Sequence, residues 1–243
     1  MLNLQSPAWA TAEIVAAAQA HAKAEFPKEA CGLVSRSRGY IPCTNEAADP
    51  INDFMISPGD WIGVSDVCGV IHSHTNNNYA PTASDMASQI ETKVAWGLIV
   101  ATEDSASDIL WWGGDTPIAP LEKRHFVHGI QDCYSLIRDW YRLERGIVLK
   151  EFPRDNGWWE GSRFDLYATG FKDAGFRQIP NDPMSIQPGD VFLSKVRSPV
   201  ENHGGLYVGN GLILHHVGGS FSCTSSASQW ARLVTRWLRY GEQ

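Results

Sequence analysis

The chain has 243 residues and a formal net charge of −7 at pH 7, and neither half carries a concentrated basic stripe, so we do not expect a nucleic-acid partner. Its 43% of hydrophobic residues can form a large core, which excludes a disordered chain, while its longest apolar run is far shorter than the roughly 20 residues of a membrane-spanning helix. The N-terminus lacks the features of a signal peptide and the five cysteines lack paired spacing, so we expect a soluble globular protein, made in a reducing cytoplasm without a disulfide framework.

The first half of the chain mixes short helices with short strands. An Ala-rich helix is predicted from Thr11 to Ala24, with Thr11 as its cap. A short helix begins at Pro58, and another is predicted over Asp85–Lys93. Strands are predicted at Cys31–Ser35, Tyr40–Thr44, Phe54–Ser57, Val67–His74, Trp96–Thr102 and Asp108–Trp112.

A linker is predicted at Gly113–Pro120, where two glycines and two prolines occur in eight residues. The charge balance changes there: residues 1–118 hold 5 Lys and Arg against 14 Asp and Glu, whereas residues 119–243 hold 15 against 13. Such an asymmetry indicates two separately built units. We therefore predict two domains, residues 1–116 and residues 117–243.

Helices also precede strands in the second half. Helices are predicted over Cys133–Arg145 and Phe164–Gly175, followed by a strand at Val191–Lys195. Strands at His203–Val208 and Leu212–Val217 are joined by Gly-Asn-Gly, a strong hairpin signal. The expected class of both domains is α+β.

A metal site is predicted in the first domain. His72 and His74 end a strand, and alternate residues of a strand project from one face, so both imidazoles can reach one ion. Asp85 follows beyond a loop long enough to fold back. Two His and one carboxylate leave a fourth tetrahedral position for water, which is typical of catalytic zinc. Zinc lowers the pKa of such a water to about 7, and Glu29 is a candidate base for its proton.

These residues and their spacing, within FPKEACGLV and HSHTNNNYAPTASD, resemble the JAMM (MPN) metalloprotease motif. The resemblance implies that His72, His74 and Asp85 are zinc ligands and that Glu29 is the general base. The position at which the family has an oxyanion-stabilising Ser is Thr82 here, which keeps the hydroxyl. The implied reaction is hydrolysis of a peptide or isopeptide bond.

A thiol site is predicted in the second domain. Cys133 begins a predicted helix, where the partial positive charge of the helix end favours a thiolate and a backbone N–H can act as an oxyanion donor. His203 and His215 lie on the two strands of the predicted hairpin, which brings them side by side. His203 can then take the Cys133 proton while His215 orients the His203 ring. The alternative is that Cys133 is a buried, inert thiol.

The stretches DCYSLI, PGDVFL and HGGLYVGNGLILHH resemble the NlpC/P60 family of papain-like hydrolases. Members of that family cut peptidoglycan stem peptides, so the resemblance implies a stem-peptide substrate, with Cys133, His203 and His215 as the triad. The Ser-Gly usual after the family's Cys is Tyr134-Ser135 here, and the family's upstream Tyr has no clear match.

A JAMM-like unit followed by an NlpC/P60-like unit resembles the tail assembly protein K family of lambda-like phages over essentially the whole chain. That resemblance implies a protein made in the host cytoplasm, placed at the virion tail tip with other tail-tip proteins as partners, and carrying two hydrolase sites, one zinc-dependent and one thiol-dependent. Two alternatives stay open. One is a structural tail-tip component that uses zinc for stability. The other is a cellular isopeptidase, which leaves the second unit unexplained.

Overall fold

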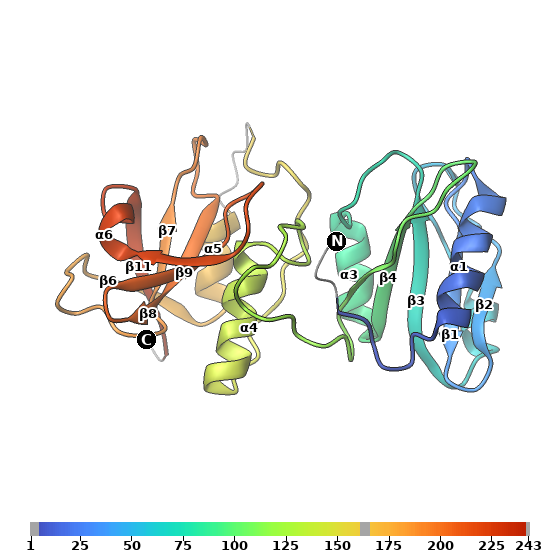
Figure 1. Ribbon diagram of the computed structural model, residues 1–243, viewed down its shortest axis with the longest axis horizontal. Helices are drawn as coiled ribbons and strands as arrows, with labels where there is room; N and C mark the ends of the chain where they lie inside the picture. The colour runs from blue at the N-terminus through green and yellow to red at the C-terminus, as the bar shows by residue number, and fades with distance from the viewer. Residues whose placement is uncertain (1–4, 161–165, 242–243) are drawn as a thin grey trace. The chain divides into compact units, whose positions relative to one another are not determined.

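The computed structural model describes residues 5–160 and 166–241. The chain divides into two compact units, one ending at Ile118 and the other beginning at Ala119 (Figure 1). Each unit combines helices with one sheet, which confirms the predicted α+β class. Within the described residues, no helix has the length and apolar character needed to cross a membrane.

The first unit is built on a five-stranded sheet. Its strand order is β2 (Gly39–Cys43), β1 (Cys31–Ser35), β3 (Val67–His74), β4 (Ala95–Val100) and β5 (Leu110–Trp112). Its helices are α1 (Ala12–Glu25), α2 (Pro58–Ile62) and α3 (Ala83–Thr92). All strand pairs are antiparallel except β3 with β4, and α3 supplies the crossover that a parallel pair requires.

The two faces of this sheet have different roles. Helix α1 begins at its predicted cap Thr11 and buries Ala18 and Ala22 against one face, where Ile71 and Ile99 of the central strands also point. Because side chains alternate along a strand, the neighbours of Ile71 point to the other face. The imidazoles of His72 and His74 therefore lie on the face away from α1.

The second unit is built on a six-stranded antiparallel sheet. Its strand order is β10 (Cys223–Ser226), β9 (Leu212–His215), β8 (His203–Gly209), β7 (Val191–Ser194), β11 (Val234–Tyr240) and β6 (Phe176–Ile179). Its helices are α4 (Cys133–Arg145), α5 (Leu166–Asp173) and α6 (Ala227–Trp230). The predicted hairpin of β8 and β9 is confirmed, and its turn uses positive φ at Asn210 and Gly211, as a tight hairpin turn requires.

The core of the second unit lies between its sheet and the helices α4 and α5. Ile137 of α4 is fully buried there with Leu193 and Leu206 of the sheet. On the opposite face, Phe192 and Trp237 form a smaller cluster. The alternation of Phe192 with Leu193 along β7 thus separates two apolar layers.

Several predicted elements differ from the structure. The strand predicted at Phe54–Ser57 is wrong: Met55 N–H donates to the side chain of Asn45 at 3.2 Å, and the segment pairs with no strand of the sheet. Strands β6, β10 and β11 were not predicted. The helix predicted over Phe164–Gly175 is present as α5, and Phe164 lies outside the described residues.

Candidate metal centre and thiol site

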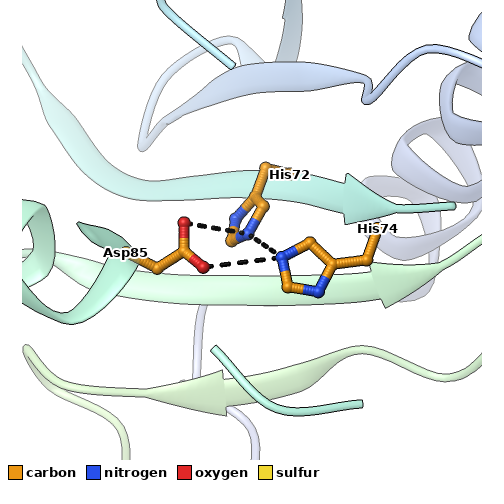
Figure 2. Close-up of side chains that lie close together, drawn as sticks. All are labelled: His72, His74 and Asp85. Atoms are coloured by element: carbon orange, nitrogen blue, oxygen red, sulfur yellow. Dashed lines mark hydrogen bonds and ion pairs between the residues drawn. The ribbon is translucent and has the colours of Figure 1, made fainter. Parts of the chain in front are cut away.

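The three predicted metal ligands meet on one face of the first sheet. Nε2 of His72 lies 3.3 Å from Nε2 of His74, and the two nitrogens lie 3.4 Å from Oδ1 and Oδ2 of Asp85, respectively. Figure 2 shows both imidazoles turned toward the carboxylate. All three residues are buried. Among the described residues, this is the one group of three or more His, Cys, Asp or Glu side chains close enough together to hold a metal ion.

The spacing of these donor atoms fits zinc. Ligand atoms at the corners of a tetrahedron around zinc, with bonds of about 2.0–2.1 Å, lie roughly 3.3–3.4 Å apart. The separation of the two imidazole nitrogens matches this value, and each of these nitrogens lies 3.4 Å from one of the two Asp85 oxygens. The donor set is also chemically suitable, because two imidazoles and one carboxylate are common zinc ligands.

Two residues that sequence reasoning missed orient the imidazoles. Nδ1 of His74 lies 3.0 Å from the backbone oxygen of Asn78, which can only accept, so the proton is on Nδ1 and the lone pair is on Nε2. The ring of Phe54 stacks on His72, with centroids 4.6 Å apart and planes at 21°. The apolar segment mistaken for a strand therefore covers the candidate metal site.

Asp85 is held as an anion by its surroundings. Burial by itself raises the pKa of Asp85, but the two imidazoles and the hydrogen bond from the Thr82 backbone outweigh burial and bring the pKa below its usual range. The Thr82 hydroxyl donates to Oδ2 of Asp85 at 2.8 Å, within a capping box at the start of α3. The single proton of the Thr82 hydroxyl thus orients the carboxylate of Asp85. The oxyanion-stabilising role of Thr82 stays a prediction.

Replacing Thr82 with Val is expected to weaken zinc binding about 10–100-fold, because the loss of an outer-shell partner typically has that effect. The loss of the cap should also destabilise α3 by about 1 kcal/mol. Competition with a chromophoric chelator measures the affinity. Thr11→Val is a matched control, because Thr11 caps α1, which packs on the face of the sheet away from the ligands. Equal zinc affinity in Thr82→Val and the wild type would contradict the orienting role.

Glu29 is placed beside the ligands by the pairing of β1 with β3. Cys31 lies opposite His72, and the N–H of Ser73 donates to the backbone oxygen of Ala30 at 2.9 Å. Continuing this antiparallel register puts Glu29 opposite His74, on the same face of the sheet. Burial raises the pKa of Glu29 to about 7, although the nearby charge of His74 opposes this shift. A carboxylate with this pKa is suited to accept and return protons near neutral pH.

The thiol of Cys133 lies at the N-terminus of α4, as predicted. Its sulfur lies 2.9 Å from the hydroxyl of Tyr167 on α5, and the backbone N–H of Gly204 on β8 also donates to it. Burial and the charge of Asp132 raise the pKa of Cys133 to about 11, although both hydrogen bonds favour the thiolate. Tyr167 could not be found from the sequence, since it lies 34 residues downstream in a different helix.

A buried ion pair holds the start of α4. The Asp132 side chain accepts from the N–H of Ser135 at 2.9 Å as the helix cap. Arg154 donates to both carboxylate oxygens, with Nε 2.9 Å from Oδ2 and a terminal nitrogen 3.1 Å from Oδ1. Burial raises the pKa of Asp132, but the charge of Arg154 outweighs it, so the pKa lies below its usual range. Sequence analysis identified neither residue of this pair as an ion-pair partner.

His203 and His215 lie together on the hairpin, with ring centroids 5.7 Å apart. His203 Nε2 and His215 Nδ1 are buried and have no hydrogen-bond partner among the described residues. His215 Nε2 lies 2.9 Å from the hydroxyl of Ser225. Burial, with a smaller effect of His215, lowers the pKa of His203 to about 3, so its ring is neutral.

The structure does not join Cys133 to His203 by a hydrogen bond in the part of the chain that it describes. The reason is the alternation of β8: a side chain at Gly204 would point toward Ile137 of α4, whereas His203 packs against Phe192 on the other face of the sheet. Of the predicted triad, His203 and His215 lie next to each other. The thiol of Cys133 lies instead against Gly204, the residue after His203, and its side-chain partner is Tyr167.

Replacing Tyr167 with Phe is expected to slow the alkylation of Cys133 at least roughly tenfold at pH 9. Burial raises the pKa of Tyr167 well above its usual range, so the phenol keeps its proton and can donate to the thiolate. A hydrogen bond to a charged group is worth about 1.5–3 kcal/mol, and its loss raises the thiol pKa further. Iodoacetamide labelling followed by mass spectrometry measures the rate. Tyr134→Phe is the control, since its hydroxyl donates to the backbone of Lys150; faster labelling of Tyr167→Phe would contradict the prediction.

Comparison with known proteins finds a JAB-like unit followed by an NlpC/P60 unit, the order that the sequence motifs predict. The family model described as "Prokaryotic homologs of the JAB domain" matches residues 11–113, and the model of the "NlpC/P60 family" matches residues 110–239. The chain is 34% identical to tail tip assembly protein K of Escherichia phage N15 over 92% of this chain and 93% of that protein. It is 29% identical to the protein of the same name from Escherichia phage lambda, over 76% and 85% of the two chains. Among solved structures, NlpC1 from Trichomonas vaginalis aligns with 88% of this chain and 70% of its own at 13% identity, with a TM-score of 0.36.

Proposed function

The chain belongs to the family of tail tip assembly protein K, and in it a JAB-like unit precedes an NlpC/P60 unit. We propose that it acts at a phage tail tip as a hydrolase with two sites. The first site would be a zinc-dependent peptidase or isopeptidase. The second would be a thiol-dependent hydrolase site for peptidoglycan stem peptides. The partners of the whole protein would be other tail-tip proteins.

The convergence of His72, His74 and Asp85 is the observation that carries the first activity. Zinc bound there would supply Lewis-acid polarisation of a carbonyl and lower the pKa of a water. The protein's own contribution is proton transfer at the Glu29 carboxylate, whose raised pKa suits that task. The second activity is supported by the Cys133 thiol, which lies at a helix N-terminus beside the N–H of Gly204, the residue that follows His203.

Glu29→Gln is expected to retain zinc while lowering turnover at the first site by about 10²–10⁴-fold, the usual contribution of a general base. The readout is the titre of infectious particles when the variant replaces the wild-type protein, together with the zinc content of the purified chain. A normal titre with normal zinc content would favour a structural use of the metal and would contradict a catalytic role for Glu29 in assembly.

Cys133→Ala is expected to abolish release of stem-peptide fragments from purified muropeptides, as read by mass spectrometry. Cys31→Ala is the matched control, since Cys31 is a buried thiol in the other unit. A chelator should leave this cleavage intact, whereas a thiol alkylator should stop it. Cleavage by Cys133→Ala at the wild-type rate would rule out the thiol assignment.

A structural role for the second unit is the competing proposal, and the state of the thiol favours it. Cys133 is buried, its pKa is raised to about 11, and its side-chain partner is a phenol rather than an imidazole. If wild-type protein releases no fragment from any muropeptide while Cys133→Ala still supports normal particles, this second proposal holds for the NlpC/P60 unit.

A further inference from the structure

The two candidate zinc ligands on β3 are held in different ways. Nδ1 of His74 has the backbone oxygen of Asn78 as its partner, which is the usual way in which a protein fixes the ring of a metal-binding histidine. Nδ1 of His72 is buried and has no hydrogen-bond partner among the described residues. The ring of His72 is instead contacted by aromatic rings: Phe54 stacks on it at 4.6 Å, and Trp96 of β4 meets it edge-on at 5.7 Å. The orientation of His72 therefore depends on what holds Phe54, which belongs to an irregular segment.

The side chain of Asn45 holds both backbone neighbours of Phe54. Its Oδ1 accepts the N–H of Met55 at 3.2 Å, and its Nδ2 donates to the backbone oxygen of Asp53 at 3.0 Å. The N–H of Glu46 donates to the backbone oxygen of Met55 at 2.9 Å and closes the same loop. Since this loop pairs with no strand of the sheet, these hydrogen bonds fix the backbone on either side of Phe54.

The amide of Asn45 also reaches the segment that carries the candidate base. Its Nδ2 donates to the backbone oxygen of Glu29 at 2.8 Å, and its Oδ1 accepts the N–H of Ala47 at 3.0 Å. Together with the contacts to Asp53 and Met55, these bonds use both amide hydrogens and both lone pairs of the amide oxygen. One side chain thus joins the loop to the segment of Glu29.

We propose that Asn45 is a positioning residue of the candidate zinc site: it fixes the loop so that Phe54 holds the ring of His72, and it ties that loop to the segment of Glu29. Asn45 acts through these residues, because its amide contacts backbone groups rather than the ligands. The inference rests on the zinc part of the proposed function and does not require that the site hydrolyses a peptide.

Replacing Asn45 with Ala should weaken zinc binding by the full-length protein roughly tenfold, the lower end of the effect of losing an outer-shell partner. Competition with a chromophoric chelator measures the affinity. Phe54→Leu should have a similar effect. The double variant should lose little more than either single variant, because both changes act on the same contact with His72. Asn52→Ala is the matched control, since Asn52 lies in the same loop and its amide donates to the carboxylate of Asp49 at 3.0 Å; its zinc affinity should equal that of the wild type.

A spectroscopic readout separates positioning from a general loss of stability. Cobalt(II) can replace zinc, and its visible absorption bands depend on the geometry of the ligands around it. The bands should shift or lose intensity in Asn45→Ala and in Phe54→Leu, and stay unchanged in Asn52→Ala. Asn45→Asp is a second variant at the same position. It can still accept the N–H of Met55 but cannot donate to backbone oxygens, so it should also weaken zinc binding.

Three results would overturn the proposal. The first is wild-type zinc affinity and wild-type cobalt spectra in both Asn45 variants. The second is a double variant in which the separate effects of Asn45→Ala and Phe54→Leu multiply, and the third is a wild-type protein that binds no zinc. Zinc binding that depends on Asn45, in a protein that cleaves no peptide, would count against the proposed peptidase activity alone.

Discussion

Replacing His74 with Ala is expected to weaken zinc binding at least roughly hundredfold, so that the purified variant carries almost no zinc. Zinc held by four ligands binds with about 10–16 kcal/mol in small sites, which is about 3 kcal/mol for each ligand. His74 has its Nε2 lone pair among the three donors, because its Nδ1 proton is used by the Asn78 carbonyl. Metal analysis of the purified chain and competition with a chromophoric chelator measure the effect.

His21→Ala is the matched control for this change. His21 lies on α1, where its Nδ1 contacts the hydroxyl of Tyr40, and it is not part of the ligand group. Its removal should leave the zinc content at the wild-type value. Full zinc occupancy in His74→Ala would mean that the three donors do not act as one site. Hydrogen exchange in β3 and β4 of both variants shows whether the fold is retained.

The convergence of the candidate ligands was predictable from the sequence only in part. His72 and His74 share a face through the two-residue period of β3, whereas α3 begins at Ala83, two residues before the predicted start, and its capping box of Thr82 with Asp85 was not predicted. The contacts that orient the ligands were not predictable, since Phe54 and Asn78 reach the imidazoles from irregular segments. Such segments carry no periodicity from which a contact can be inferred.

The second unit shows the same division between local and distant contacts. The hairpin of β8 and β9 and the start of α4 follow from turn and capping signals, and both are present. The contact of Tyr167 with Cys133 joins two helices far apart in sequence, so no local pattern indicates it. Strand β10, with the sequence CTSS and no buried residue, lacks the apolar alternation by which a strand is recognised.

The largest stability effect is expected from Arg154→Met, which should destabilise the second unit by about 3–5 kcal/mol. This substitution leaves the Asp132 carboxylate buried without its cationic partner, and an unpaired buried charge typically has that cost. Hydrogen exchange followed by mass spectrometry measures the effect separately in each unit. Protection of α4 should fall sharply, while α1 and β3 of the first unit serve as an internal control.

Acidification should lower the stability of the second unit more in the wild type than in Arg154→Met. The pKa of Asp132 lies below its unfolded value of about 4, so the folded state gains stability above that value and loses it as the pH falls toward the folded pKa. Without Arg154, the main charge that lowers this pKa is gone, and acidification should cost the variant less than it costs the wild type. The double variant Asp132→Asn with Arg154→Met removes both charges together, so it should recover much of the lost protection. Equal acid sensitivity of the wild type and Arg154→Met would show that the ion pair does not hold the start of α4.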